Sequence, residues 1–278
     1  MNKQKKELKI CLDSGAFSAF SKGVVINLDE YISFIKEHED ILEVYANLDV
    51  IGDPEGTLKN QKYMESKGLK PLPTFHYGEP IKYLKYYLDH YDYIALGGMV
   101  PIPTDKLVVW LDELFSEYLC DKKGLPVVKV HGFGMTVISL MIRYPWYSVD
   151  STSWVLTGRF GGVLIPKKVG GQYNYLVDPI KVSVSDKSPD RKESGQHLMT
   201  FSAQEKKEIM SYIEARGFKL GKTTINKEGE ETVVEKGLSN DYTQRDRMNI
   251  QYFLDLEKAL PEWPWAFERK NFKKGFGF

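Results

Sequence analysis

The chain has 278 residues, 42% of them hydrophobic, and its basic and acidic side chains balance to a formal net charge of zero. This length and composition fit one large folded α/β domain and argue against a disordered chain. No apolar stretch approaches the roughly 20 residues that a membrane-spanning helix needs. The basic N-terminus lacks an apolar signal core, so we expect a cytoplasmic protein without a membrane anchor.

The two cysteines and the distribution of charge indicate which kinds of site and partner suit this chain. Cys11 and Cys120 lie far apart and in no metal-like spacing, which disfavours a zinc site or a disulfide framework and predicts two buried thiols. Residues 1–154 carry 17 basic and 21 acidic side chains, whereas residues 155–278 carry 21 basic and 17 acidic. A basic second half suits contact with a polyanion, although a bias this small also arises by chance.

Residues 1–154 alternate between short apolar runs and amphipathic segments. Strands are predicted at 8–13, 42–50, 69–75, 93–98, 126–134 and at the start of 146–154, and helices at 27–40, 53–68, 79–91, 104–124 and 136–145. Asn27 is the expected N-cap of the first helix, and Pro54 and Gly68 mark the start and end of the second. The alternation predicts a parallel sheet, and the length favours a (β/α)8 TIM-like barrel. A doubly wound sheet is the alternative, but no GxGxxG turn follows the first strand.

After Trp154 the alternation breaks. Residues 161–166 and 175–185 are predicted either as the two remaining strands or as a hairpin joined by a VGGQ turn. Helices are predicted at 202–217 and 241–261, and a surface loop or hairpin at 227–237. Without an internal repeat or a clear linker, we expect one domain over 1–278, with residues from about 155 onward as a C-terminal elaboration.

Residues suited to a functional site follow five of the predicted strands. They are Asp13, Asn47 with Asp49, Gly97-Gly98-Met99, His131-Gly132-Phe133-Gly134, and Asp150. An unpaired buried charge costs several kcal/mol or more, so carboxylates at strand ends indicate a site at the C-terminal face of the sheet. Strand alternation puts Asn47 and Asp49 on the same side, and glycines let a ligand approach the backbone.

Each of these features also has a purely structural explanation. The aspartates can cap the segments that follow, Asn47 and Asp49 can be a satisfied polar pair, paired glycines can relieve crowding, and a lone histidine is more often a structural hydrogen-bonding residue. Five such strand ends in one chain nevertheless favour a catalytic or binding face. Retaining glycosyl transfer needs two carboxylates, one to attack the anomeric carbon and one to move protons, and Asp13 and Asp150 can supply them.

The motifs DSGAF, NLD, LGGM, HGFG and SVDSTSW, in this order over about residues 8–160, resemble the tRNA-guanine transglycosylase (queuine tRNA-ribosyltransferase-like) superfamily. The resemblance implies a (β/α)8 barrel pentosyltransferase that exchanges guanine for a 7-deazaguanine base in nucleic acid without an organic cofactor. Asp13 matches the family's proton-handling aspartate, Asp150 its nucleophile and Asp49 its base-recognising aspartate. Ala16 and Ser18 depart from the family motif DSGGFQ. The implied base-binding residues are Ser14, Phe17, Asn47, Asp49, Gly97, Gly98, Met99, His131 and Gly132, with Phe17 and Met99 on either side of the ring.

The substrate expected from this resemblance is DNA. The family's tRNA enzymes carry a zinc subdomain of three cysteines and a histidine, which Cys11 and Cys120 alone cannot build. Zinc-free paralogues from phages and bacterial DNA-modification islands insert 7-deazaguanine bases into DNA, and the chain resembles these more. We therefore expect DNA and a base such as 7-cyano-7-deazaguanine as partners, no metal, and the host cytoplasm as the location if the chain is phage-encoded.

Several alternatives stay open at this point. They are a tRNA transglycosylase with an accessory subunit or as a homodimer, a nucleoside or base N-glycoside hydrolase, and a non-catalytic nucleic-acid-binding module. The basic residues that can contact phosphate, if they are not simply solvated surface, are Lys167, Lys168, Arg191, Lys192, Arg245 and Arg247.

Overall fold

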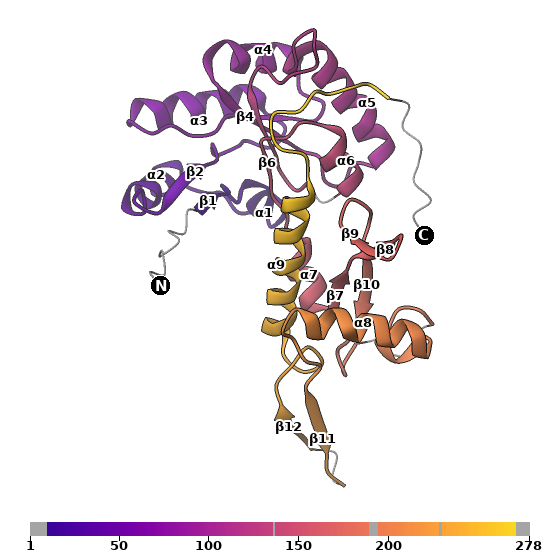
Figure 1. Cartoon of the computed structure of the whole chain (residues 1–278). Coiled ribbons are helices and arrows are strands. Elements are labelled where there is room, and N and C mark those ends of the chain that lie inside the picture. The colour runs from indigo at the N-terminus through magenta and orange to yellow at the C-terminus, as the bar shows by residue number, and fades with distance from the viewer. Residues whose placement is uncertain (1–9, 136, 189–193, 228–229, 271–278) are drawn as a thin grey trace, which may run out of the picture. The chain divides into compact units, whose positions relative to one another are not determined.

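The structure is a computed structural model that describes residues 10–135, 137–188, 194–227 and 230–270 (Figure 1). The described residues form two compact units. The first contains residues 10–135, 144–150 and 263–270, and the second contains residues 137–143, 151–188, 194–227 and 230–262. The sequence pattern breaks close to the point where the main part of the second unit begins. None of the helices in the described part of the chain is both long and apolar enough to cross a membrane.

Parallel strands alternate with helices in the first unit, as the sequence predicts. The strands are β1 (Ile10–Leu12), β2 (Leu42–Tyr45), β3 (Thr74–His76), β4 (Tyr93–Gly97), β5 (Lys129–Gly132) and β6 (Ser148–Val149). The helices are α1 (Ala16–Ser21), α2 (Leu28–Glu37), α3 (Pro54–Ser66), α4 (Ile81–His90) and α5 (Thr104–Leu114), which continues into the π-helical turn η1 (Phe115–Leu119). Helix α1 was not predicted. The helix predicted over 104–124 ends at Leu119, because Cys120 is extended and bridges to Pro126.

Consecutive strands of the first unit are neighbours and run in the same direction. Strand β1 pairs with β2, an isolated parallel bridge joins Ala46 to Leu72, and β3, β4, β5 and β6 pair in that order. The mixed α/β class and the parallel order are thus confirmed. Because parallel strands end at one edge of a sheet, the residues that follow them come to the same edge.

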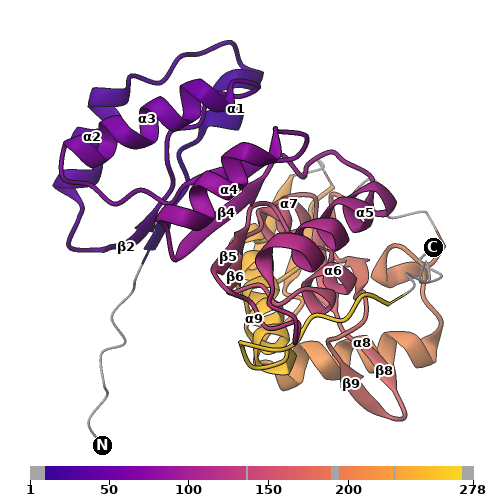
Figure 2. The same ribbon diagram turned by 90° about the horizontal axis from the view of Figure 1, so that it is seen from above.

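Local sequence signals determine where the first helices begin. Helix α2 begins where the Asn27 side chain accepts the backbone N–H groups of Asp29 and Glu30, as expected for an N-cap. Figure 2 shows α2 and α3 side by side, and the Tyr63 hydroxyl of α3 donates to the Asp29 carboxylate at 2.9 Å. Alternation along β1 turns Leu12 toward the apolar cluster beneath these helices.

The same alternation turns Cys11 to the opposite face of β1, where it is exposed. Cys120 is only partly buried, and both cysteines are free. The prediction of two buried thiols was therefore wrong, and it failed because one β1 position faces away from the helices.

The second unit combines helices with antiparallel pairs. Its elements are α6 (Ile138–Arg143), α7 (Ser153–Arg159), β7 (Gly162–Ile165), β8 (Lys167–Val169), β9 (Gln172–Asn174), β10 (Ile180–Ser183), η3 (Leu198–Thr200), α8 (Ala203–Ala215), β11 (Lys222–Ile225), β12 (Glu231–Glu235) and α9 (Tyr242–Ala259). Strand β7 pairs antiparallel with β10, and a β8–β9 hairpin lies between them in sequence. The hairpin alternative for residues 161–185 is thus the one observed, with the VGGQ turn closing β8 onto β9. The predicted hairpin near 227–237 is β11–β12.

An apolar core holds the second unit together. Val163 and Val182 of the β7–β10 pair, Ile213 of α8 and Met248 of α9 are all essentially fully buried in it. The Asn249 side chain ties α9 to β7 by accepting the Leu164 N–H at 2.9 Å and donating to the Gly162 carbonyl. Figure 1 shows the β11–β12 hairpin projecting from the rest of this unit, and every residue of β12 is exposed.

Candidate functional site

The three aspartates singled out by the sequence follow strands of the first unit. Asp13 follows β1, Asp49 lies a few residues beyond β2, and Asp150 follows β6. Asp13 leads into α1 through Gly15, whose φ of 72° is a left-handed conformation that suits glycine. The Gly15 N–H lies 3.4 Å from an Asp13 carboxylate oxygen, a weak bond that leaves the carboxyl group accessible.

The pKa of Asp13 is raised above the ordinary value of an aspartate. The residue is accessible to solvent, but protein atoms surround much of its carboxyl group, and this burial raises the pKa of Asp13. The nearby carboxylates of Asp150 and Asp49 raise the pKa further, against the lowering effect of the Gly15 N–H.

Asp150 is held by one of its two carboxylate oxygens. Its Oδ1 accepts the backbone N–H of Gly134 at 2.7 Å and lies 3.6 Å from His131 Nε2. Gly134 has a φ of 65°, which directs its N–H as few other residues could. No hydrogen bond from the described residues reaches the second oxygen of Asp150, and the side chain is 42% exposed. Asp150 is thus held through one oxygen and open at the other.

His131 lies next to Asp150 and belongs to a chain of polar contacts that continues through Ser148 to Tyr93. The histidine is only 3% exposed, and its Nδ1 lies 2.6 Å from Ser148 Oγ. Ser148 Oγ in turn lies 2.7 Å from the Tyr93 hydroxyl. These contacts fix the imidazole ring whichever groups donate, and they leave Nε2 as the ring atom nearest Asp150. Nε2 is buried and makes no hydrogen bond with the described residues, and the predicted contact of His131 with a base stays a prediction.

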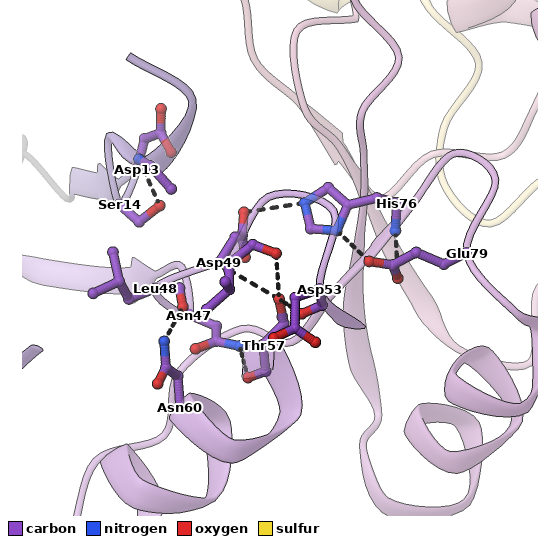
Figure 3. A network of polar contacts seen from close by, with 12 residues as sticks. Asp13, Ser14, Asn47, Leu48, Asp49, Asp53, Thr57, Asn60, His76 and Glu79 are labelled. Atoms are coloured by element: carbon purple, nitrogen blue, oxygen red, sulfur yellow. Dashed lines mark hydrogen bonds and ion pairs between the residues drawn. The ribbon is translucent and has the colours of Figure 1, made fainter. Parts of the chain in front are cut away.

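His76, which the sequence analysis missed, bridges two acids at the end of β3. Figure 3 shows its ring pointing at Asp49 on one side and Glu79 on the other. Its Nε2 lies 3.2 Å from Asp49 Oδ2 and its Nδ1 lies 3.0 Å from Glu79 Oε1. Burial alone would lower the pKa of His76, but the two carboxylates outweigh it and raise the pKa to about 9. The ring is therefore an imidazolium at neutral pH.

Gly97 makes room for this histidine. A Cβ atom on Gly97 would lie 2.8 Å from His76 Cδ2 and 3.0 Å from Thr74 Cγ2, closer than side-chain atoms normally pack. Gly98 follows with a φ of 67°. The structural explanation considered for this glycine pair, relief of crowding, thus describes Gly97 well.

Asn47 is fully buried, and its side chain holds the loop after β2 in place instead of facing solvent. Its Nδ2 donates to the Thr57 carbonyl of α3 at 3.0 Å, while Asn60 Nδ2 donates to the Leu48 carbonyl at 2.8 Å (Figure 3). These bonds lock the segment after β2 onto α3 and so aim Asp49. The Asp49 Oδ1 atom is buried with no hydrogen bond from the described residues, which leaves it as an acceptor.

The residues expected to enclose a planar ligand differ in how far their side chains are exposed to solvent. Phe17 on α1 is 59% exposed, whereas Met99 is 3% exposed and belongs to the packed interior. Ser14 is also buried, and its Oγ accepts the Ala16 N–H at the start of α1. Gly132 packs against the Trp146 ring, 3.1 Å from where its Cβ would lie. Only Phe17 of these four presents a side chain to solvent.

The basic residues proposed to contact phosphate divide into three groups. Lys167 and Lys168 on β8 and Arg247 on α9 are exposed. Arg245 is only 6% exposed, and its guanidinium donates to the carbonyls of Gly158 and Leu238, so it is no ordinary surface cation. Arg191 and Lys192 lie outside the described residues.

The site residues that the sequence analysis missed differ in whether the sequence gives any signal for them. His76 and Glu79 stand at a strand end, three positions apart, and the rule used for the other strand ends would have included them had the third strand been extended by one residue. Tyr93 and Ser148 give no such signal, because their contact with His131 depends on how β4, β5 and β6 lie side by side.

Comparison of the chain with models of protein families, with curated proteins and with solved structures finds no match. The chemistry of the site must therefore be argued from its residues.

Proposed function

We propose that the protein is a base-exchange transglycosylase, a pentosyltransferase that replaces guanine in DNA with a 7-deazaguanine base through a covalent aspartyl-glycosyl intermediate. One observation carries the proposal. Asp150 is oriented by a backbone N–H and keeps an open oxygen, while Asp13, within its electrostatic reach, has a raised pKa. A nucleophile and a proton carrier are the two carboxyl groups that retaining glycosyl transfer requires.

We infer further that the strands close into a TIM-like arrangement. In a flat sheet, β1 and β6 would be separated by five strand spacings of ~4.8 Å, or roughly 24 Å. Cys11 is accessible to solvent, but the protein atoms that surround much of its thiol raise the pKa of Cys11 to about 11, and the charge of Asp150 beyond β6 raises it further. Cys11 likewise contributes to the raised pKa of Tyr93 on β4. These charge effects between strands far apart in the pairing order support the proposed (β/α)8 barrel.

In the first half of the proposed reaction the open oxygen of Asp150 attacks C1′ of a deoxyguanosine. A C–O bond forms as the C1′–N9 bond breaks, and the bonding electron pair leaves with guanine. Asp13 gives its proton to the departing base and becomes a carboxylate. The target nucleotide must leave the base stack to reach these residues.

In the second half the incoming 7-deazaguanine base gives its N9 proton to Asp13. N9 then attacks C1′, the ester bond to Asp150 breaks, and both carboxyl groups return to their starting states. Configuration at C1′ is retained because it is inverted twice. The intermediate conserves the energy of the old glycosidic bond, so no organic cofactor is needed.

Asp49 is the residue proposed to recognise the base edge. The His76 imidazolium holds its Oδ2 atom. The Oδ1 atom, buried without a hydrogen bond from the described residues, is the acceptor left for N–H groups of a guanine-like ring, and the ring must displace the atoms that cover it. Phe17, which is exposed beside Asp13 in sequence, supplies an apolar surface for the ring. The hydrogen bonds of Asn47 and Asn60 to the neighbouring backbone keep this segment in place.

The experiment that tests this function is base exchange on duplex DNA and on tRNA in parallel, with radiolabelled guanine and 7-cyano-7-deazaguanine. Incorporation of label into DNA alone is the expected result. Label in tRNA alone would replace DNA by tRNA as the substrate. Release of free guanine without incorporation would point to a hydrolase, in which water resolves the intermediate, and would contradict the proposal.

A further inference from the structure

The second unit contains a cavity that the proposed reaction does not use. Its volume is about 420 Å³, within the ~300–1,000 Å³ typical of small-ligand sites. It is lined by the C-terminal end of α7, the segment after β10, the β11–β12 hairpin and the N-terminal end of α9, elements that lie together in Figure 1. All of its lining residues belong to the second unit.

A buried guanidinium contributes to the lining of this cavity. Arg245 donates through Nε to the Gly158 carbonyl and through Nη1 to the Leu238 carbonyl, both at 2.6 Å. Within the described residues no carboxylate forms an ion pair with it, and Nη2 has no hydrogen bond. A guanidinium has more donors than these two bonds use, and those left over form a rigid fork. Burial lowers the pKa of Arg245, against the raising effect of the nearby Asp246 and Asp241 carboxylates.

Other cations stand around the same cavity. Arg159 lines it, and its side chain makes no hydrogen bond or ion pair with the described residues, although the charge of Asp246 lies near enough to interact with it. Lys187 lines it while paired to Glu231 at 2.9 Å. The cationic lining residues are Arg159, Lys187 and Arg245, against Asp186 and Glu231 as acids. The backbone and hydroxyl groups of serines also line the cavity, and such donors suit an anion.

Two exposed aromatic rings complete the lining. Phe160 is 67% exposed and Tyr242 is 54% exposed, and they lie at the C-terminal end of α7 and the N-terminal end of α9. Rings this exposed contribute little to a core. A planar heterocycle can stack on such a ring, and stacking is the sequence-tolerant way in which proteins hold unpaired bases.

We propose that this cavity binds a nucleoside phosphate, with the phosphate between Arg245 and Arg159 and the base against Phe160 or Tyr242. The ligand is either a free nucleotide or one unit of an unpaired nucleic-acid strand, because both present the same phosphate and ring. The inference does not depend on base exchange, since the cavity and the acids at the strand ends belong to different units.

Calorimetric titration of the full chain with deoxyguanosine monophosphate tests the proposal. Arg159→Gln should weaken binding about tenfold or more, because it removes a charged donor to phosphate. The matched control is Lys207→Gln, which removes an exposed cation of α8 outside the cavity lining and should change affinity less than about twofold. Equal affinities of the two variants, or no binding to the unaltered chain, would overturn the proposal.

Two further titrations separate the parts of the ligand. Phe160→Ala combined with Tyr242→Ala should weaken binding of the nucleotide about fivefold or more, while leaving inorganic phosphate unaffected. If the double variant binds the nucleotide as well as the unaltered chain does, the base is not recognised and the proposal fails. A single-stranded oligonucleotide without terminal phosphates should displace the nucleotide if a strand is the natural ligand. Binding of the nucleotide without displacement would still support the site and assign it to free nucleotides.

Discussion

His76 shows how neighbouring residues decide the charge of a side chain. Its ring is 15% exposed and bridges Asp49 and Glu79, so a histidine that would be largely neutral at pH 7 is instead charged. The imidazolium neutralises part of an acidic cluster and fixes one oxygen of Asp49. It therefore belongs to the base-recognition part of the proposed site.

The charged state of His76 makes stability depend on pH. The pKa is about 9 in the folded chain against an ordinary value of 6.5, so the stabilisation is fully present below pH 6.5 and is lost as the pH rises to 9. We expect the free energy of unfolding to fall over this window by on the order of 2 kcal/mol more in the unaltered chain than in His76→Gln. Urea unfolding at several pH values measures both slopes. Parallel slopes for the two chains would show that His76 is not charged.

His131 is expected to act through Asp150 rather than on the base. His131→Gln should lower the kcat of base exchange roughly tenfold to a hundredfold, because a mispositioned nucleophile reacts slowly, and should leave the KM for the incoming base within about twofold. Tyr93→Phe, one step further along the same polar chain, should have a smaller effect in the same direction. A raised KM with an unchanged kcat would instead make His131 a base contact, as its sequence pattern first indicated.

At the scale of elements, local signals predicted more than long-range contacts. The cap at Asn27, the proline at Pro54 and the alternation of apolar runs located the helices and the parallel strands correctly. Helix α1 was missed because its six residues follow a glycine in a left-handed conformation and look like part of a loop motif. Burial of Arg245 was missed because its acceptors are 87 and 7 residues away in sequence. The α9 pattern alone gives no sign of them.

The packing of β4 against β3 depends on Gly97. Gly97→Ala should destabilise the chain by about 1–3 kcal/mol, because its new methyl group would overlap the His76 ring and the Thr74 methyl group. Gly68→Ala is a useful comparison: Gly68 has a φ of 85° and open space around it, so the change should cost only about 1–2 kcal/mol of backbone strain. The two variants should also differ in the pH dependence of their stability, because only Gly97→Ala is expected to weaken the contribution of His76. Thermal unfolding across the pH range compares them, and an unaltered pH dependence in Gly97→Ala would contradict this account.

Helix α8 begins with a capping box. Ser202 accepts the Glu205 N–H, and the Glu205 carboxylate accepts the Ser202 N–H in return. Ser202→Ala should lower the unfolding free energy of the second unit by about 1 kcal/mol. The same substitution at Ser211, exposed in the interior of α8, should be neutral or slightly stabilising because alanine favours helix. Equal effects of both substitutions in urea unfolding would show that the cap contributes nothing.

At the scale of the whole molecule, the sequence predicted which strand ends carry acids but not how the individual side chains of the candidate site are placed. The rule that acids at strand ends mark a site found Asp13, Asp49 and Asp150, and charge coupling links Asp13 to both of the others. The rule could not show that Asn47 is turned into the protein toward α3, or that Met99 is buried, because both outcomes depend on packing between elements far apart in sequence. Which oxygen of each aspartate is left open is likewise decided only by the folded chain.

The central claim is that Asp150 forms a covalent bond to the sugar, and its most direct test is identification of that adduct. The chain would be incubated with guanine-containing duplex DNA without an incoming base, denatured rapidly in acid, digested and examined by peptide mass spectrometry. We predict a deoxyribosyl-DNA adduct on the peptide that contains Asp150, and no adduct with Asp150→Asn. An adduct on a different residue, or full base exchange by Asp150→Asn, would contradict the account.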